Sequence, residues 1–420
     1  MNAALQLHRP GWAAAGGAEF KKFGFAHRCG MRFSSGMKPV VAPVFSAVLS
    51  VFLAAAPAAE VRVERVPNGG LQPQALTDVR GVVHLVYLSG TPRGCDVFYV
   101  RREPGKGEFT APLRVNSQPG SAVAAGTIRG AQIAMGRGGR IHVVWNGSDR
   151  AEPKPSTQSA PLLYSRINDA GTAFEPQRNL INATQHLDGG GTVAADGNGN
   201  VYAFWHSAPQ GDTTGEPGRM VFLARSRDEG VTFERERIVS PEPTGACGCC
   251  GMKAFSDSLG NLYALYRTAA GTFNRDMTLL VSRDRGEHFT SETLHRWRIG
   301  QCPMSSEFLT EVRGRVLAAW ETDGPVQFAS LNPADLKPPA PTSPAGMGKA
   351  KHPAMAVNQS GEILLVWSEA SGRQRGGAVT WQVFNPDGGP AGKQQHQKGT
   401  PALSFAAAVA GADGSFTVFY

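Results

Sequence analysis

The chain has 420 residues, of which 41% are hydrophobic and 18% are charged, so a disordered protein is excluded and a large buried core is expected. Its 51 Gly and 29 Pro make up about one residue in five, which indicates many turns and argues against a helical bundle. The formal net charge of +8 suggests an acidic partner until its distribution along the chain is considered.

Residues 37–58 have the pattern of a secretory signal peptide. Lys38 precedes an uncharged apolar run over 40–56, and Ala56-Pro57-Ala58 supplies a small-x-small cleavage site. The run is short and has prolines at its start, which argues against a membrane anchor. We therefore expect an exported protein, periplasmic or secreted, with a leader over 1–58 and one mature domain over 59–420.

Most of the positive charge lies in this leader. Residues 1–58 carry six basic side chains and one acidic side chain, so +5 of the +8 belongs to them and about +3 remains. The remainder holds no basic run with interleaved aromatic residues, so no nucleic-acid partner is expected.

One pattern recurs seven times: a turn with Gly, then four or five apolar residues that end in an aromatic. The copies end at Tyr87, Trp145, Trp205, Tyr266, Trp320, Trp367 and Tyr420. The apolar run is typical of a buried strand, and the segments before the turn (131–135, 191–195, 353–357) suit a hairpin partner. Third and fourth strands are expected at 162–165, 221–224 and 234–239.

Four antiparallel strands in every 50 to 60 residues predict an all-β fold, the β-propeller. The seventh copy stops after two strands, and the alternating segment Val61–Val66 can complete it. We therefore predict seven blades of mostly four strands, closed by an N-terminal strand, with six blades as the alternative.

The turn after the third strand carries a second motif. Residues 226–233 and 282–289 both read S-x-D-x-G-x-x-F, and Asp169 to Phe174 keeps the same Asp–Gly and Asp–Phe spacing. The Asp can accept backbone N–H groups, the Gly can take a positive φ, and the Phe can pack under the hairpin. The motif resembles the Asp-box (BNR) repeat of sialidases and related propellers, and the resemblance covers most of 60–420. An Asp box is structural, so it implies fold rather than activity.

The resemblance also implies where sialidase chemistry would lie. Sialidases hold a substrate carboxylate with three Arg and use an Asp acid/base with a Tyr nucleophile assisted by Glu. By position, the candidates are Arg65, Arg267 and Arg275 for the Arg group and Asp96 for the acid/base. The stretches where the family has its Glu and Tyr read 247–253 (CGCCGMK) and 302–308 (CPMSSEF), so standard sialidase catalysis is not expected.

Each of these candidates also has a structural interpretation. Arg65 can be a solvated strand residue, Asp96 a turn former, and Arg267 a salt-bridged structural residue at the end of a buried strand.

Four cysteines are expected to lie together. Cys247, Cys249 and Cys250 stand in the connection entering the fourth blade and Cys302 in that entering the fifth, and a propeller places these connections side by side. In an exported protein we expect two disulfides, with Cys95 free or a third partner. The alternatives are a thiolate site for a soft metal such as Cu(I) and a redox-active pair, since C-x-C-C departs from zinc spacing. Uncharacterised exported sialidase-like proteins have a similar C-x-C-C loop, which assigns no activity.

The same face is expected to carry further polar residues: Arg129, His186, Asp188, His206, Asp276, Glu307, Glu321, His352 and Glu369. The candidates for ligand binding are Arg129, Asp276, Glu307 and Glu321. Histidines scattered on loops are usually solvated, so we expect neither a metal nor a cofactor.

The expected function is that of an exported Asp-box propeller that binds a glycan or a cell-envelope protein without sialidase catalysis. The alternative is an exo-glycosidase of sialidase type acting on anionic sugars, with Asp96 as acid/base and the Arg group as carboxylate clamp. We expect a monomer with no membrane span after signal removal.

Overall fold

The structure is a computed structural model that describes residues 58–420, except 127, 333, 335, 337–339, 347, 371 and 373. These residues belong to one compact unit, Ala56–Tyr420. The signal peptide expected at 37–58 lies outside the described residues apart from Ala58. Among the described residues, no helix is long and apolar enough to cross a membrane.

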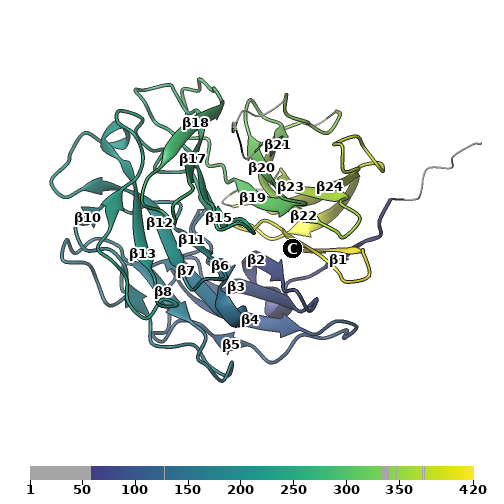
Figure 1. Cartoon of the computed structure of the whole chain (residues 1–420), viewed down its shortest axis with the longest axis horizontal. Helices are drawn as coiled ribbons and strands as arrows, with labels where there is room; N and C mark the ends of the chain where they lie inside the picture. Colours follow the sequence, from purple (N-terminus) through teal and green to yellow (C-terminus); the bar gives the residue numbers. More distant parts are fainter. Residues whose placement is uncertain are drawn as a thin grey trace, which may run out of the picture. The chain divides into compact units, whose positions relative to one another are not determined.

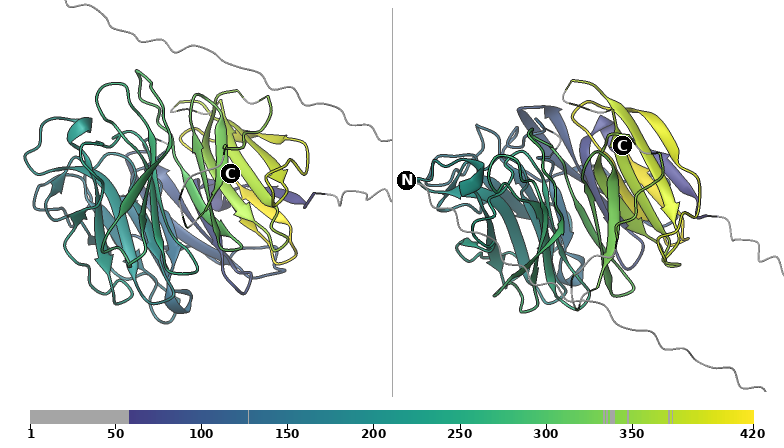
Figure 2. Two further views of the ribbon diagram at one scale, coloured as in Figure 1. Left: turned by 45° about the horizontal axis from the view of Figure 1, so that its top comes forward. Right: turned by 90° about the horizontal axis from the view of Figure 1, so that it is seen from above.

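Seven small sheets stand in a ring, which confirms the seven-bladed β-propeller and overturns the six-bladed alternative (Figures 1 and 2). The first two sheets contain β2 (Leu71–Thr77), β3 (Val83–Thr91), β4 (Gly94–Arg102) and β5 (Leu113–Arg114), then β6 (Gln132–Met135), β7 (Ile141–Asn146), β8 (Leu162–Arg166) and β9 (Arg178–Asn179). The next two contain β11 (Thr192–Ala195), β12 (Val201–Pro209), β13 (Met220–Ser226) and β14 (Arg237–Ile238), then β15 (Met252–Ser256), β16 (Leu262–Arg267), β17 (Met277–Ser282) and β18 (Thr290–His295). The short β10 (Thr184–Gln185) also pairs with β12.

The remaining sheets vary in strand number. They contain β19 (Phe308–Val312), β20 (Arg315–Glu321) and β21 (Val326–Leu331), then β22 (Ala350–Val357), β23 (Ile363–Glu369), β24 (Gly377–Phe384) and β25 (Gln395–Thr400), and last β26 (Ala407–Ala410) and β27 (Phe416–Phe419). Three short 3₁₀ turns lie between strands: Pro67–Gly69, Arg137–Gly139 and Glu216–Gly218.

The strand β1 (Val61–Glu64) adds to the seventh sheet beside β27. The two strands are parallel, with Val61 opposite Phe416 and Glu64 opposite Phe419. Two backbone hydrogen bonds of Tyr420 extend the contact. Its N–H donates to the Glu64 carbonyl, and its carbonyl accepts from the Val66 N–H, both at 3.0 Å. The role of β1 in closing the ring stays a prediction, and a test is given below.

The core lies between neighbouring sheets. The aromatic that ends each repeat is buried in all seven copies, and Trp205, Trp320 and Trp367 are completely buried. One core cluster joins Leu88 of the first sheet to Trp145 of the second. Burying a large apolar side chain stabilises a fold by roughly 1.5–3 kcal/mol, so the recurring aromatic holds each sheet to its neighbours.

The two complete Asp boxes fix their hairpins as expected. Asp228 accepts the Thr232 backbone N–H at 2.9 Å and the Thr232 hydroxyl at 2.6 Å. Gly230 has φ +76°, which suits glycine. Phe233 packs edge-on against the Tyr164 ring of the preceding sheet, with centroids 4.9 Å apart. The box therefore fastens its own hairpin and also the neighbouring sheet.

The expectation for the third, incomplete box was wrong in one position. Asn168, and not Asp169, accepts the Thr172 backbone N–H at 3.0 Å. The Asp169 carboxylate instead turns outward and pairs with Arg140. The amide oxygen of Asn168 can replace a carboxylate in this role because the turn needs only an acceptor.

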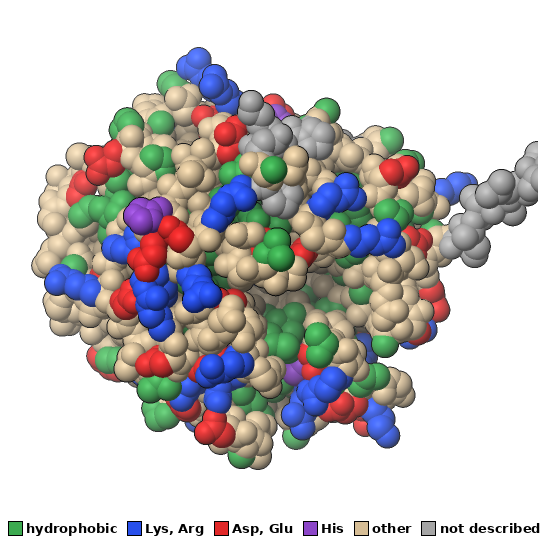
Figure 3. Space-filling model, viewed as in Figure 1, with side chains coloured by type: hydrophobic (Ala, Val, Ile, Leu, Met, Phe, Trp, Pro, Cys, Tyr) green, Lys and Arg blue, Asp and Glu red, His purple; other side chains and the backbone are tan. Residues whose placement is uncertain are grey.

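The inner strands of the sheets surround a central cavity of about 620 Å³. Its wall includes many Ala, Val and Met residues together with the charged Asp78, Arg80 and Lys253, and the space-filling view shows a hollow near the centre of the face in view (Figure 3). Because the strands alternate in direction, the connections that enter each sheet and the loops after its second strand share one end of the ring. We call this end the entry face; the described parts of its entering connections lie within 115–131, 180–191, 239–251, 296–307, 332–349 and 401–406.

Candidate functional site

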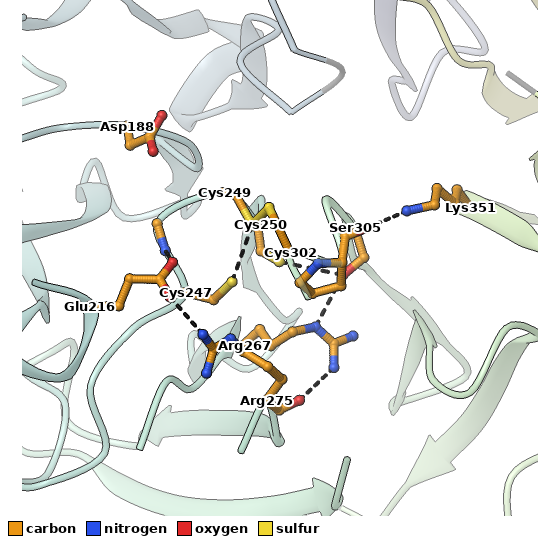
Figure 4. The surroundings of a disulfide bond; sticks show 12 residues. Asp188, Glu216, Cys247, Cys249, Cys250, Arg267, Arg275, Cys302, Ser305 and Lys351 are labelled. Carbon is orange, nitrogen blue, oxygen red and sulfur yellow. Dashed lines mark hydrogen bonds and ion pairs between the residues drawn. A yellow bond between two sulfur atoms is a disulfide. The ribbon is translucent and has the colours of Figure 1, made fainter. Parts of the chain in front are cut away.

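The predicted meeting of the cysteine-bearing connections is confirmed. A disulfide between Cys249 and Cys302, with Cα atoms 6.5 Å apart, joins connection 239–251 to connection 296–307 (Figure 4). The expectation of a second disulfide in this cluster was wrong, because Cys247 and Cys250 are free and buried. Cys95 is also free and buried, on β4 of the first sheet.

The sulfur atoms of Cys247, Cys249 and Cys250 lie within 4.8 Å of one another. The Cys247 and Cys249 sulfurs are 3.5 Å apart. Among the described residues, these three form the one group of three or more potential metal ligands that lie together. The candidate histidines do not join it. His206 uses Nε2 on the Cys250 carbonyl at 3.0 Å, and burial lowers its pKa to about 4.

Backbone contacts hold the cysteine loop in place. The Cys247 N–H donates to the Arg267 carbonyl at 2.9 Å, and the Gly251 N–H donates to the Ser305 carbonyl at 2.8 Å. Glu216, in the loop after β12, accepts the Gly248 N–H at 2.8 Å. Sequence reasoning missed Glu216. The available signal was its place in a loop that the propeller layout puts beside the cysteine loop.

Arg267 ends β16 and is 1% exposed. Its guanidinium donates to the Ser305 hydroxyl at 3.0 Å, to the Arg275 carbonyl at 2.7 Å and to the Glu321 carbonyl at 2.5 Å. It also lies over the Trp297 ring, 4.7 Å from the centroid. All three hydrogen-bond acceptors are neutral, so the charge of this buried cation must be balanced by other nearby groups.

The Cys250 thiol supplies such a group. Burial opposes its ionisation, but the hydrogen bond from Cys247, the positive charge of Arg267 and contacts with Ser305 outweigh burial and lower its pKa. The same hydrogen bond, together with burial, raises the pKa of the Cys247 thiol. Of the two buried thiols, Cys250 is therefore the more readily ionised.

Two buried carboxyl groups face the same region. Glu307 and Glu321 are each 5% exposed. Both carboxyl oxygens of Glu307 and one of Glu321 have no hydrogen-bond partner within the described part of the chain. Burial raises the pKa of Glu307 well above its usual range and that of Glu321 to about 7, although Lys351 lies 3.9 Å from the second carboxyl.

The three candidate arginines of the sialidase pattern are held by different neighbours. Arg275 lies in the loop between β16 and β17 of the fourth sheet, close to Arg267. Its guanidinium donates to the Glu216 carboxylate at 2.7 Å. Arg65 is exposed beside the seventh sheet, where it donates to the Gly399 carbonyl at 2.6 Å and lies over the Tyr420 ring.

The candidate acid/base, Asp96, holds a loop. Its carboxylate accepts the Asn116 side chain at 2.8 Å and the Gly120 N–H at 2.7 Å. Asp276 similarly accepts the Trp297 N–H at 2.9 Å. The catalytic and ligand-binding roles of these residues stay predictions.

A pocket of about 410 Å³ opens on the entry face, and we call it the entry pocket. It is lined by Ala125, Gly126, Ile128, Arg129, Asp188, Cys249, Met304, Gln374 and Leu403. Arg129 is therefore the candidate that the structure places in an open site. Its guanidinium pairs with the Asp188 carboxylate and also donates to the Asp188 carbonyl at 2.8 Å.

No family model matches the sequence, and neither does any curated protein. Solved structures do resemble the chain. A protein of unknown function from Dyadobacter fermentans is 15% identical over 81% of this chain and 97% of that one, with a TM-score of 0.50. A Hadza microbial sialidase is 14% identical over 76% of this chain and 69% of that one, with a TM-score of 0.47. The intramolecular trans-sialidase from Ruminococcus gnavus is 12% identical over 82% and 88%, with a TM-score of 0.42.

At these identities the likeness concerns the fold alone. The chain is a seven-bladed β-propeller whose structural neighbours include sialidases and related propeller proteins.

Proposed function

We propose that this protein is an exported propeller that binds a glycan in the entry pocket without hydrolysing it. One observation carries the proposal: among the described residues that line the entry pocket, Asp188 is the one carboxylate, and it is already paired with Arg129. Glycoside hydrolysis of the usual kind needs two carboxyl groups, or a Tyr in place of one, facing a single sugar. The described lining of the entry pocket offers no such pair.

The chemistry of the entry pocket suits a sugar. Its volume of about 410 Å³ is within the range of small-molecule sites, so it accommodates one or two sugar units rather than the surface of a protein. The Arg129–Asp188 pair and the Gln374 amide offer donors and acceptors for hydroxyl groups. Met304 and Leu403 offer apolar surface for the C–H face of a sugar ring.

An exported location fits the disulfide, because disulfides persist in oxidising compartments. A glycan of the cell envelope is then the partner within reach. A cell-envelope protein, the other expected partner, needs a broader surface than the pocket.

The test is a titration of the purified protein with neutral and anionic oligosaccharides by calorimetry. Binding is expected to fall by about tenfold or more in Arg129→Ala, because the loss of a charged donor costs on the order of 1.4 kcal/mol or more. Arg101→Ala, an exposed arginine on β4 outside the pocket, is the matched control and keeps wild-type affinity. Equal affinity of both variants would place binding elsewhere.

The alternative function, an exo-glycosidase using Asp96, has a separate readout. Wild-type protein and Asp96→Asn are incubated with fluorogenic sialosides and other anionic glycosides. Turnover by the wild type that is lost in the variant would replace the binding role with hydrolysis.

A further inference from the structure

We propose that Cys247, Cys249, Cys250 and Cys302 form a thiol–disulfide exchange site, in which one disulfide moves between an outer and an inner cysteine pair. The outer pair is Cys249–Cys302, as in the structure, and the inner pair is Cys247 and Cys250. This inference goes beyond glycan binding and does not depend on it.

The outer pair is accessible. Cys302 is exposed, and Cys249 is half-buried and lines the entry pocket. A thiol from another molecule can therefore reach the disulfide from solvent. The disulfide joins connections that enter neighbouring sheets. If it opened, the connection that contains Cys249, which lines the entry pocket, would no longer be tied to the connection that contains Cys302.

The inner pair lies directly beside this disulfide. The Cys247 sulfur is 3.5 Å from the Cys249 sulfur, and the Cys250 sulfur is within 4.8 Å of both. Figure 4 shows the three sulfurs of the loop gathered at the disulfide, with Arg267 and Ser305 alongside. Exchange requires a thiolate that attacks a disulfide sulfur, and these distances need only small side-chain movements.

The surroundings favour a thiolate in the buried pair. Arg267 cannot lose its proton, and its hydrogen bonds all go to neutral oxygens. Ser305 accepts from Arg267 and lies 3.7 Å from the Cys250 sulfur, so it links the cation to the thiol. The nearby carboxyl groups of Glu307 and Glu321 are held toward their neutral forms by burial, so they compete weakly with the thiolate for the cation.

The internal exchange takes two steps and no external oxidant. First, the Cys247 sulfur passes its proton to Cys250 and attacks Cys249. The Cys247–Cys249 bond forms, the Cys249–Cys302 bond breaks, and Cys302 leaves with the electron pair and takes a proton from water. Second, Cys250 loses its proton to solvent and attacks Cys247, so Cys249 leaves as a thiolate that is protonated in turn. The disulfide is then Cys247–Cys250, and two thiols face solvent.

An external small thiol or dithiol can also open the outer disulfide. Its thiolate attacks the exposed Cys302 sulfur, a mixed disulfide forms on Cys302, and Cys249 leaves as a thiolate. A second external thiol then releases Cys302 as a thiol and carries away the oxidised product. The chemical class of co-substrate is therefore a thiol or dithiol compound.

The experiment detects internal exchange in the absence of any external thiol. Purified protein, with Cys249–Cys302 verified as its starting bridge, is incubated with an alkylating reagent near pH 8, and the labelled cysteines are mapped by mass spectrometry. Cys302 is expected to become labelled although it begins in a disulfide. In Cys247→Ser/Cys250→Ser, which keeps Cys249 and Cys302, the labelling rate of Cys302 is expected to fall by at least tenfold.

Cys95→Ser is the matched control, because Cys95 is another free, buried cysteine that lies in a different sheet; it keeps wild-type labelling of Cys302. Circular dichroism and intact mass show whether each variant is folded with its disulfide formed. Equal labelling of Cys302 in wild type and in Cys247→Ser/Cys250→Ser would overturn the proposal.

A measurement on the wild type alone gives a second test. The protein is equilibrated in glutathione buffers of varied ratio, quenched with acid and mapped, and bridged species with Cys247 are expected beside Cys249–Cys302. Detection of Cys249–Cys302 as the single bridge at every ratio would overturn the exchange. If the protein shows no such exchange and stoichiometric Cu(I) protects Cys247 and Cys250 from alkylation, a soft-metal site would replace the exchange site.

Discussion

The Cys250 thiol and the Arg267 guanidinium meet through one hydroxyl group. Ser305 Oγ accepts from Arg267 Nε at 3.0 Å and lies 3.7 Å from the Cys250 sulfur. The buried cation therefore has an ionisable sulfur within reach through Ser305. Arg267, which the sialidase resemblance assigns to the carboxylate clamp, also lies beside the protein's own cysteines, and its role in ligand binding stays a prediction.

Replacing Arg267 with Met is expected to destabilise the fold strongly. The change removes the donor to the Ser305 hydroxyl and to the Arg275 carbonyl, and it removes one of two donors to the Glu321 carbonyl, which also accepts from the Thr322 hydroxyl. The expected loss in the free energy of unfolding is about 3–5 kcal/mol, measured by urea denaturation. Arg101→Ala, an exposed arginine on β4 that pairs with the exposed Glu103, serves as control and leaves the curve nearly unchanged. A loss as small as that of the control would show that Arg267 is not buried in these contacts.

Gly230→Ala tests the packing of the Asp box against the neighbouring sheet. A methyl group at this position overlaps the hydroxyl of the buried Tyr164, whereas at Gly211, with a similar φ of +86°, no atom lies within 4 Å. Gly211→Ala is therefore expected to cost about 1–2 kcal/mol from backbone strain alone. Gly230→Ala is expected to cost about 3 kcal/mol or more. Equal losses in thermal or chemical unfolding would contradict the contact.

The free energy of unfolding is expected to fall as the pH rises, because of the buried carboxyl group of Glu321. Burial raises its pKa in the folded state to about 7, from the usual 4.5. Below pH 4.5 the group is protonated in both states; as the pH rises, the unfolded state ionises first, so stability falls until the pH passes about 7. Glu321→Gln removes this loss of about 3 kcal/mol. The difference between variant and wild type, from urea curves between pH 4.5 and 8, should grow with pH; a constant difference would contradict it.

Two substitutions in β1 test whether this strand closes the ring. Val63 packs against the core of the last two sheets, while the neighbouring Arg62 is on the exposed side and pairs with Glu60. If β1 closes the ring, Val63→Asp loses about 2–3 kcal/mol of unfolding free energy, because a charge is placed on an apolar surface. Arg62→Gln has no measurable effect. Similar melting curves for the two variants would assign the closing role to other contacts.

The fold was predictable because its determinants are local and repeated. Each repeat has a large aromatic in its second strand or directly after it, and each aromatic is buried. The turn motif marks the third strand by the chemistry of Asp and Gly. At the incomplete box, spacing selected Asp169 although Asn168 is the acceptor, because the two residues are adjacent and the backbone decides which side chain turns inward.

The site was predictable only in position. The propeller layout brought the four cysteines together, but Cys302 has three possible partners in C-x-C-C, and the loop conformation selects Cys249. The partners of Arg267 include two backbone carbonyls, which carry no sequence signal. The burial of Glu307 depends in the same way on the path of its connection.

The parallel pairing of β1 with β27 has a consequence for the order of folding. Val61 and Phe416 are partners from opposite ends of the described chain. During synthesis from the N-terminus, β1 has no partner until β27 has emerged, and contacts between segments so far apart form slowly. The seventh sheet is therefore expected to be the last to assemble, and β1 stays unpaired until β27 has been synthesised.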